Sequence, residues 1–104
     1  MKKILFILPF LFFACNTVKK QRQELIKQHD WPEYKVSIIR NAQIDIGFTY
    51  EQVKAALGKP VRVNRTTSKR YYQEQWVYQR VQGYNVVPWY VYFDETGKVT
   101  TIQR

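Results

Sequence analysis

The chain has 104 residues, which is enough for one domain and too few for a large enzyme. Seventeen lysines and arginines against eight aspartates and glutamates give a formal net charge of +9. Such a balance favours nucleic acid, anionic lipid or an acidic protein as a partner. A single cysteine excludes an intrachain disulfide, so the fold depends on packing alone.

Residues 1–14, MKKILFILPFLFFA, have the layout of a secretory signal peptide, with two lysines ahead of an apolar run. The run from Ile4 to Ala14 would form a helix of about 16 Å, well short of the roughly 30 Å of a bilayer core. We therefore expect a cleaved signal peptide rather than a membrane-spanning helix. Cleavage removes Lys2 and Lys3 and leaves most of the basic excess in the mature chain. Export makes nucleic acid a poor candidate. The expected partner is anionic phospholipid, a glycan or another envelope protein.

Cys15 follows the apolar run directly, and the segment LFFAC resembles the lipobox of bacterial lipoproteins. In that family the cysteine thiol is lipidated and becomes the first mature residue, so the resemblance implies lipidation of Cys15. An unmodified thiol is the alternative. Asn16 implies transfer to the outer membrane, since the inner-membrane retention signal of such lipoproteins is typically aspartate at that position. The composition from Asn16 to about His29 is polar and basic, which predicts a flexible tether. Residues 15–29 would thus comprise the lipidated cysteine that the resemblance implies and this tether.

A first short helix is predicted from Asp30 to about Asn41. Asp30 is the expected cap, with Glu33 as its reciprocal partner and Pro32 tolerated in the first turn. One face should pack on the domain, and on it Ile38, Ile39 and Ala42 are expected to lie with Trp31 or Tyr34.

A second short helix is predicted within GFTYEQVKAALGKP, residues 47–60. Gly47 closes a turn, Thr49 caps the helix with Gln52 as its box partner, Gly58 ends it and Pro60 prevents its resumption. The expected apolar stripe consists of Val53, Ala56 and Leu57.

After Pro60 the apolar residues recur every second position, which is typical of strands. A first strand around Val61 to Asn64 is followed by a basic turn, and YYQEQWVYQRV predicts a long second strand. Residues 83–88 are expected to be a loop, WYVYF a third strand, DETG a tight turn and KVTTI the last strand. Residues 30–104 therefore predict an α+β domain in which two short N-terminal helices pack on an antiparallel meander of three or four strands.

The alternation along the strands assigns side chains to the two faces of the sheet. The residues expected to face the helices are Val61, Val63, Trp76, Trp89, Val91 and Phe93. The opposite face should then carry Arg62, Asn64, Gln73, Gln75, Tyr90 and Tyr92. Tyrosines give a large contact area at low entropic cost, so we predict that a partner binds these six residues.

Basic residues are concentrated around the first strand, with no acidic residue between positions 52 and 73. The residues concerned are Lys59, Arg62, Arg65, Lys69 and Arg70, and we expect them to face anionic phospholipid or an acidic partner. The alternative is a solvated turn. Lys59 also suits the negative end of the second helix dipole.

The order and spacing of three motifs, IxxGFTxEQVxxxLGKP, EQWVY and YVYFDxxGKVTxI, resemble the SmpA/OmlA domain of BamE-like small outer-membrane lipoproteins. The resemblance runs from about Ile44 to Ile102, with Phe48 standing where the family has methionine. It implies an ααβββ-type fold facing the periplasm. In the best-known members it also implies an accessory role, without catalysis, in inserting β-barrel proteins into the outer membrane.

Little in the sequence points to catalysis. With one histidine and one cysteine a cage of such ligands is excluded, and the carboxylates are scattered without a spacing that suggests acid–base work. Ser37 and Ser68 have no base nearby in the sequence. We therefore expect a binding module with no metal or cofactor, either an envelope scaffold or an inhibitor or ligand-binding module. The second alternative arises because β-lactamase inhibitor proteins share this architecture.

Overall fold

The computed structural model describes residues 17–104, so Cys15, Asn16 and the predicted signal peptide lie outside the described residues. A helix over residues 17–28 precedes the labelled elements, which are α2 (Glu33–Arg40), α3 (Tyr50–Leu57), β1 (Arg62–Ser68), β2 (Tyr71–Gln82), β3 (Asn85–Phe93) and β4 (Val99–Gln103). The four strands pair antiparallel in the order β1-β2-β3-β4. The predicted α+β meander is confirmed.

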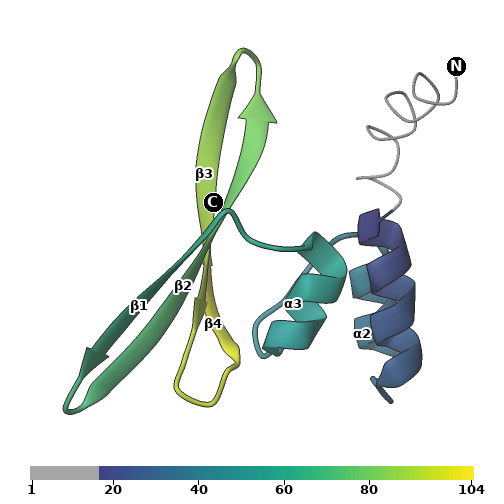
Figure 1. Cartoon of the computed structure of the whole chain (residues 1–104), viewed down its shortest axis with the longest axis horizontal. Coiled ribbons are helices and arrows are strands. Elements are labelled where there is room, and N and C mark those ends of the chain that lie inside the picture. Colours follow the sequence, from purple (N-terminus) through teal and green to yellow (C-terminus); the bar gives the residue numbers. More distant parts are fainter. Residues whose placement is uncertain (1–16) are drawn as a thin grey trace, which may run out of the picture.

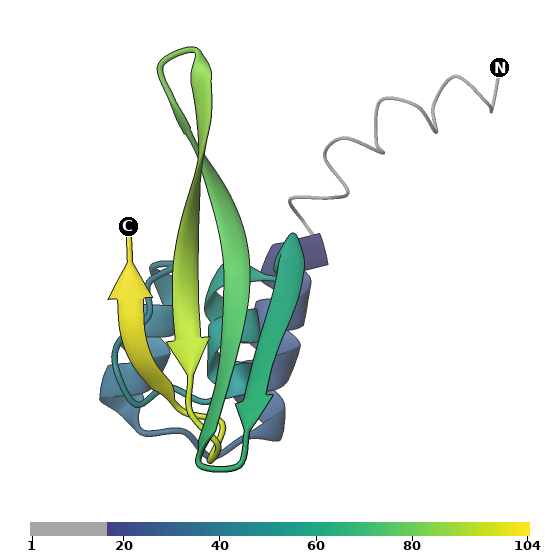
Figure 2. The same ribbon diagram turned by 90° about the vertical axis from the view of Figure 1, so that its left-hand side faces the viewer.

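The helices all lie on one side of the sheet, with α3 between the sheet and the other two helices (Figures 1 and 2). We call the side toward α3 the inner face and the opposite side the outer face. The core joins α2, α3 and the inner faces of β2, β3 and β4, and its largest fully buried side chains are Phe48, Phe93, Ile39, Val53, Val91 and Val99.

The second predicted helix is confirmed as α3, and so are the residues predicted to cap its start and to end it. The backbone N–H of Gln52 donates to Thr49 Oγ1 (3.4 Å), and the backbone N–H of Thr49 donates to Gln52 Oε1 (2.9 Å), which completes the capping box. Gly58 ends the helix with a φ of 81°, in the left-handed region that glycine tolerates. Val53 and Ala56 are buried as expected.

The first predicted helix forms as α2, but its predicted cap is wrong. Pro32 occupies the N-cap position without a side-chain hydrogen bond, so Asp30 lies outside the helix. Proline has a preset φ and no N–H, and both suit a helix start. Ala42 lies beyond the end of α2 and is exposed, because its backbone turns into the left-handed region at a φ of 57°.

The buried side of α2 is carried by Val36 and Ile39. Ile38 is half-buried and packs against the core, as does Trp31. Tyr34, the other aromatic residue expected on that side, is exposed.

The predicted flexible tether is wrong for residues 17–28, which form a helix packed on the domain. Leu25 and Ile26 lie against the core, and Val18 lies beside Gly58. Arg22 adds polar contacts to the backbone of α3. The helix is stabilised by these tertiary contacts, since the segment has few apolar residues of its own.

The predicted loop over residues 83–88 is also wrong. Only Gly83 and Tyr84 connect β2 to β3, and the resulting hairpin projects beyond the rest of the sheet (Figure 2). Pro88 is part of β3 and pairs with Gln79. The ladder between β3 and β4 begins only at Tyr90, so Pro88 has an open side where its missing N–H breaks no ladder bond.

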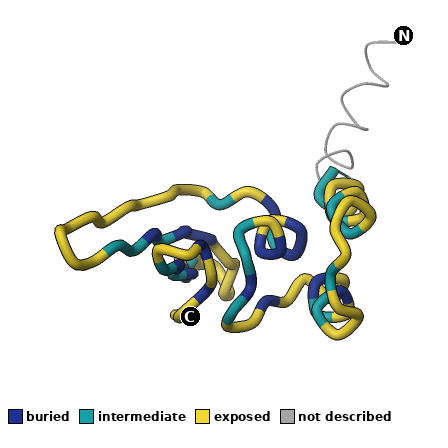
Figure 3. The backbone as a smooth tube through the Cα atoms, turned by 90° about the horizontal axis from the view of Figure 1, so that it is seen from below, coloured by how far each residue is buried: buried dark blue, intermediate teal, exposed yellow. Residues whose placement is uncertain are grey.

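β1 is exposed along its whole length. Val63, and Val61 just before the strand, were expected to face the helices, but no helix covers them. Val61 is 62% exposed and Val63 is 38% exposed. The predicted face is confirmed for Val63, which pairs with Trp76 and lies on the same side of the sheet. The core, however, extends only over β2, β3 and β4. Figure 3 shows the contrast between exposed β1 and the buried middle of β2.

Candidate functional site

The six residues predicted to bind a partner lie on the outer face, where no helix covers the sheet (Figure 2). Asn64 pairs with Gln75, which in turn pairs with Tyr92. The next row contains Arg62 and Tyr90 with Val77 between them, and Gln73 lies opposite Thr66. The strand register therefore brings residues from three strands together, as the alternation predicts.

A chain of side-chain hydrogen bonds crosses all four strands on this face. Asn64 Nδ2 donates to Gln75 Oε1 (2.8 Å), and Gln75 Nε2 donates to the Tyr92 hydroxyl (2.9 Å). The Tyr92 hydroxyl then donates to Gln103 Oε1 on β4 (2.9 Å). We call these four residues the outer ladder. Because each member holds the next, the side chains of these four residues have defined orientations.

The two tyrosines lie on the sheet rather than standing away from it. Their ring centroids are 6.4 Å apart and both side chains are half-buried. Val77 is only 4% exposed although it belongs to the outer face, and its cross-strand neighbours are Arg62 and Tyr90. Alternation in the sequence did not indicate this apolar centre, because the residues next to Val77 along β2, Trp76 and Tyr78, are also buried.

Arg65 was predicted to face anionic phospholipid or an acidic partner, but it pairs with an acidic residue of its own chain. Its Nε donates to Glu74 Oε1 at 2.6 Å, and the Glu74 side chain is 6% exposed. The hydrogen bond to Glu74, followed by the charge of that carboxylate, raises the pKa of Arg65. Arg65 therefore neutralises a buried carboxylate on the inner face.

The other basic residues are spread along β1 rather than gathered in one patch. Lys69 and Arg70 form the turn between β1 and β2, whereas Lys59 lies before the opposite end of β1. A seven-residue strand spans about 20 Å, so the two groups are too far apart to bind one head group. Arg62 belongs to the outer face.

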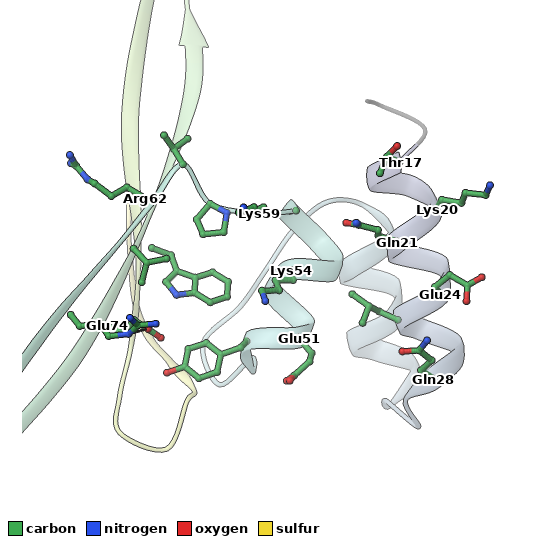
Figure 4. Close-up of a pocket in the computed structure, with 18 of the residues that line it drawn as sticks. Thr17, Lys20, Gln21, Glu24, Gln28, Glu51, Lys54, Lys59, Arg62 and Glu74 are labelled. Atoms are coloured by element: carbon green, nitrogen blue, oxygen red, sulfur yellow. Dashed lines mark hydrogen bonds and ion pairs between the residues drawn. The ribbon is translucent and has the colours of Figure 1, made fainter. Parts of the chain in front are cut away.

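A groove that sequence patterns did not indicate lies between the helix over residues 17–28 and α3 on one side and β1 and β2 on the other (Figure 4). We call it the helix–strand groove. Its volume is about 1290 Å³. Apolar lining comes from Leu25, Tyr50, Val61, Val63 and Trp76. It could not be expected while residues 17–28 were taken as a tether.

Tyr50 forms part of the groove wall and interacts with the buried carboxylate of Glu74. Its ring lies 5.4 Å from that of Trp76 and 4.5 Å from that of Phe93, measured between centroids. Burial, followed by the hydrogen bond and the charge of Glu74, raises the pKa of Tyr50 well above its ordinary value. The phenol is therefore a neutral hydrogen-bonding group at any physiological pH.

Within residues 17–104 there is no group of three or more His, Cys, Asp or Glu side chains placed to hold a metal ion. None of the helices in the same part of the chain has the length and apolar character that crossing a bilayer requires.

Comparison of the chain with protein families, with curated proteins and with solved structures finds no match.

Proposed function

We propose that the protein is a non-enzymatic binding module of the bacterial cell envelope, and that a partner protein docks on the outer face of its sheet. The outer ladder is the observation that carries this proposal. The outer face carries amides and two tyrosines around a buried valine, and tyrosine is enriched at protein interfaces.

The arrangement suits protein recognition for an energetic reason. Association loses free energy for each side chain that it immobilises, at about 0.5–1.5 kcal/mol. Tyr92 and Gln75 already share a hydrogen bond, and Tyr90 lies beside Tyr92, so less freedom remains to be lost. A partner gains flat aromatic area and a row of amide donors and acceptors.

The membrane setting of the proposal rests on the N-terminal sequence. A signal peptide, a lipidated Cys15 and Asn16 after it make the chain a lipoprotein of the outer membrane that faces the periplasm. The resemblance of residues 44–102 to BamE-like lipoproteins makes the β-barrel assembly machinery the first partner to test. Lys69 and Arg70 at the β1–β2 turn then act as a minor contact to anionic phospholipid.

Affinity capture from detergent-solubilised envelopes tests the proposal. The acylated full chain should retain a stable envelope complex, and the β-barrel assembly machinery is the expected one. Capture of a soluble periplasmic hydrolase would favour the inhibitor alternative. Recovery of the chain from the soluble fraction without any bound protein would contradict the proposal.

A further inference from the structure

The hairpin of β2 and β3 continues past the rest of the sheet (Figure 2). The ladder with β1 reaches Val77 and the ladder with β4 reaches Tyr90, and these two residues pair with each other across the hairpin. Beyond that row the two strands pair only with each other, up to Gln82 and Asn85. Along β2 the distance from Val77 to Gln82 is about 17 Å. We call residues 79–88 the projecting hairpin.

The end of the projecting hairpin is apolar, although no other described element covers it. Val81 and Val86 pair across the two strands and are 78% and 60% exposed, and Tyr84, in the turn, is fully exposed. We call these three residues the hairpin tip. A valine pair stabilises a bare hairpin through its cross-strand contact. Tyr84 has no such role, because a fully exposed side chain adds nothing to packing. Apolar side chains gathered at one exposed place are typical of a binding surface.

The projecting hairpin lies on the side of the molecule where the lipid anchor is expected. Val18 lies beside Gly58, shortly before β1, and β1 begins at the level of Val77. The helix over residues 17–28 thus starts near the row where the hairpin leaves the sheet, and the helices extend from that row away from the hairpin (Figure 2). Cys15 precedes Val18 by three residues, which span about 10 Å at most. Since the hairpin extends farther than this link, a bilayer that holds Cys15 is within its reach.

Charge is distributed unevenly between this end of the domain and the other. Exposed basic residues belong to the projecting hairpin, to the first turn of the helix over residues 17–28 or to the start of β1, and they are Lys19, Lys20, Lys59, Arg62 and Arg80. None of the eight acidic residues of the chain lies in these segments. The opposite end carries Glu51 in the first turn of α3, and Asp94 and Glu95 after β3. The end with the hairpin is therefore cationic and suits an anionic surface.

We propose that the hairpin tip inserts into the head-group region of the bilayer that anchors Cys15, where the basic residues around it meet anionic phospholipid. The inference rests on the lipidation of Cys15 in the proposed function, and it adds which end of the domain faces the membrane. Tyrosine suits the boundary between water and hydrocarbon, because its ring is apolar and its hydroxyl stays hydrated. Lysine and arginine are attracted by the negative potential of the surface. A sheet that stands on its hairpin leaves the outer face open to a partner protein.

The minor contact of Lys69 and Arg70 with phospholipid belongs to the opposite orientation, because the β1–β2 turn lies at the far end of the sheet (Figure 2). Asp94 and Glu95 are at that same end, where β3 stops, and they repel an anionic surface. The turn is also far from Val18 and hence from the anchor. We therefore expect the hairpin contact to dominate, and the experiment compares the two ends.

The test places a fluorescent dye at either end of the acylated full chain in vesicles. Gln82→Cys provides a thiol beside the hairpin tip and Ser68→Cys provides one at the β1–β2 turn, since the only native cysteine, Cys15, is acylated. The vesicles contain phosphatidylcholine with or without phosphatidylglycerol, and a spin-labelled phospholipid quenches dyes at their surface. With phosphatidylglycerol, the dye at residue 82 should be quenched at least about threefold more than the dye at residue 68. This difference should shrink in phosphatidylcholine alone, and in salt of about 1 M, where the Debye length is about 3 Å.

Two tyrosine variants test the apolar part of the contact. Tyr84→Ser should reduce the quenching at residue 82 by about half or more. Tyr71→Ser removes an exposed tyrosine at the far end of the sheet and should leave the quenching unchanged. Because both side chains are exposed, both variants should unfold at the temperature of the wild type.

Two charge variants test the electrostatic part in the same way. Arg80→Glu combined with Lys59→Glu should reduce the quenching at residue 82 in vesicles with phosphatidylglycerol. Lys69→Glu combined with Arg70→Glu changes the net charge by the same amount at the far end, and should not reduce it.

The failures of the anchor and of the inference are distinguishable. A chain that does not sediment with the vesicles would contradict the lipidation of Cys15, and the inference with it. An anchored chain in which neither dye is quenched would overturn the inference alone, as would stronger quenching at residue 68 than at residue 82. Equal quenching of the two dyes would show a domain that lies flat on the surface. Quenching at residue 82 that does not depend on phosphatidylglycerol would remove the anionic surface as the partner.

Discussion

The guanidinium of Arg22 lies at the C-terminal end of α3, where its Nε donates a hydrogen bond of 2.9 Å to the carbonyl oxygen of Ala55. Its Nη2 donates to the carbonyl of Ala56 (3.0 Å) and its Nη1 to that of Arg40, at the end of α2 (3.4 Å). The last carbonyls of a helix have no partner within it and carry the negative end of its dipole. One arginine thus stabilises two helix ends and holds the helix over residues 17–28 on the domain.

Replacing Arg22 by methionine should release this helix without unfolding the sheet. Hydrogen bonds to a charged group contribute about 1.5–3 kcal/mol, so amides of residues 17–28 should exchange about ten- to a hundredfold faster. Lys19→Met, at an exposed position of the same helix, is the control and should leave exchange unchanged. Equal exchange in the two variants would show that the packing of Leu25 and Ile26 alone holds the helix.

Tyr78 links β2 to the end of α3, because its buried hydroxyl donates to the carbonyl of Gly58 at 2.9 Å. Tyr78→Phe should lower the free energy of unfolding by about 1–2 kcal/mol at neutral pH. Burial raises the pKa of Tyr78 above its ordinary value of 10, so the protonated phenol is favoured in the folded state. Its contribution is complete below pH 10 and declines as the pH rises above that value.

Urea unfolding of both proteins at pH 7 and at a pH above 10 measures this dependence. The gap between wild type and Tyr78→Phe should narrow at the higher pH, since only the wild type loses the contribution of that phenol. A gap that stays constant would mean that the phenol does not titrate differently in the folded and unfolded chains.

Gly97 and Gly83 differ in what surrounds them, although both have a positive φ, at 79° and 63°. A Cβ at Gly97 would lie 2.7 Å from Tyr50 Cε2, whereas a Cβ at Gly83 would meet nothing within 4 Å. Alanine at either position suffers the left-handed strain, about 1–2 kcal/mol. Gly97→Ala should cost about 1–3 kcal/mol more, because the Tyr50 ring is confined by Trp76 and Phe93. Thermal unfolding of the two variants gives the comparison, and equal losses would show that the ring moves freely.

The ends of α3 and the face of the sheet on which a strand side chain lies could be predicted because their signals are local. Thr49, Gln52 and Gly58 are within ten residues of one another, and each has its own preferred position at a helix end. Alternation likewise placed Tyr90 and Tyr92 on one face. Both kinds of signal depend on residue type and spacing alone.

The features that could not be predicted depend on contacts between distant parts of the chain. Arg22 meets Ala55 and Ala56 across more than thirty residues, and no periodicity in residues 17–28 indicates this. Alternation tells which way Val63 points, but not that the core stops short of β1. The helix–strand groove depends on both features, so it appears only in the folded chain.

Cys15 is predicted to be lipidated and to become the first residue of the mature protein. Each buried methylene contributes about 0.8 kcal/mol, so a terminus with several acyl chains is a stable anchor. Cys15→Ser should accumulate as an unprocessed precursor that no longer takes up labelled palmitate. Migration and membrane fractionation identical to those of the wild type would show that the chain is not a lipoprotein.

A loss of binding in a tyrosine variant can be assigned to the outer face only if the variant still folds. Tyr90→Ala combined with Tyr92→Ala should lower stability less than Trp89→Ala, which removes a buried core side chain and should cost about 3–5 kcal/mol. Chemical unfolding of the two variants checks this order. If the tyrosine pair proves the more damaging change, the face is part of the fold's stability and any loss of binding has another cause.

Partner capture by that double variant is the most direct test of the proposed function. Tagged wild type, the Tyr90→Ala and Tyr92→Ala variant, and a control with Tyr34→Ala and Tyr84→Ala, two exposed tyrosines away from the outer ladder, are compared in solubilised envelopes. The outer-face variant should bind the captured complex at least about thirtyfold more weakly, a loss of about 2 kcal/mol, while the control binds as wild type does. Equal binding by all three proteins, or a loss confined to the control, would contradict docking on the outer face.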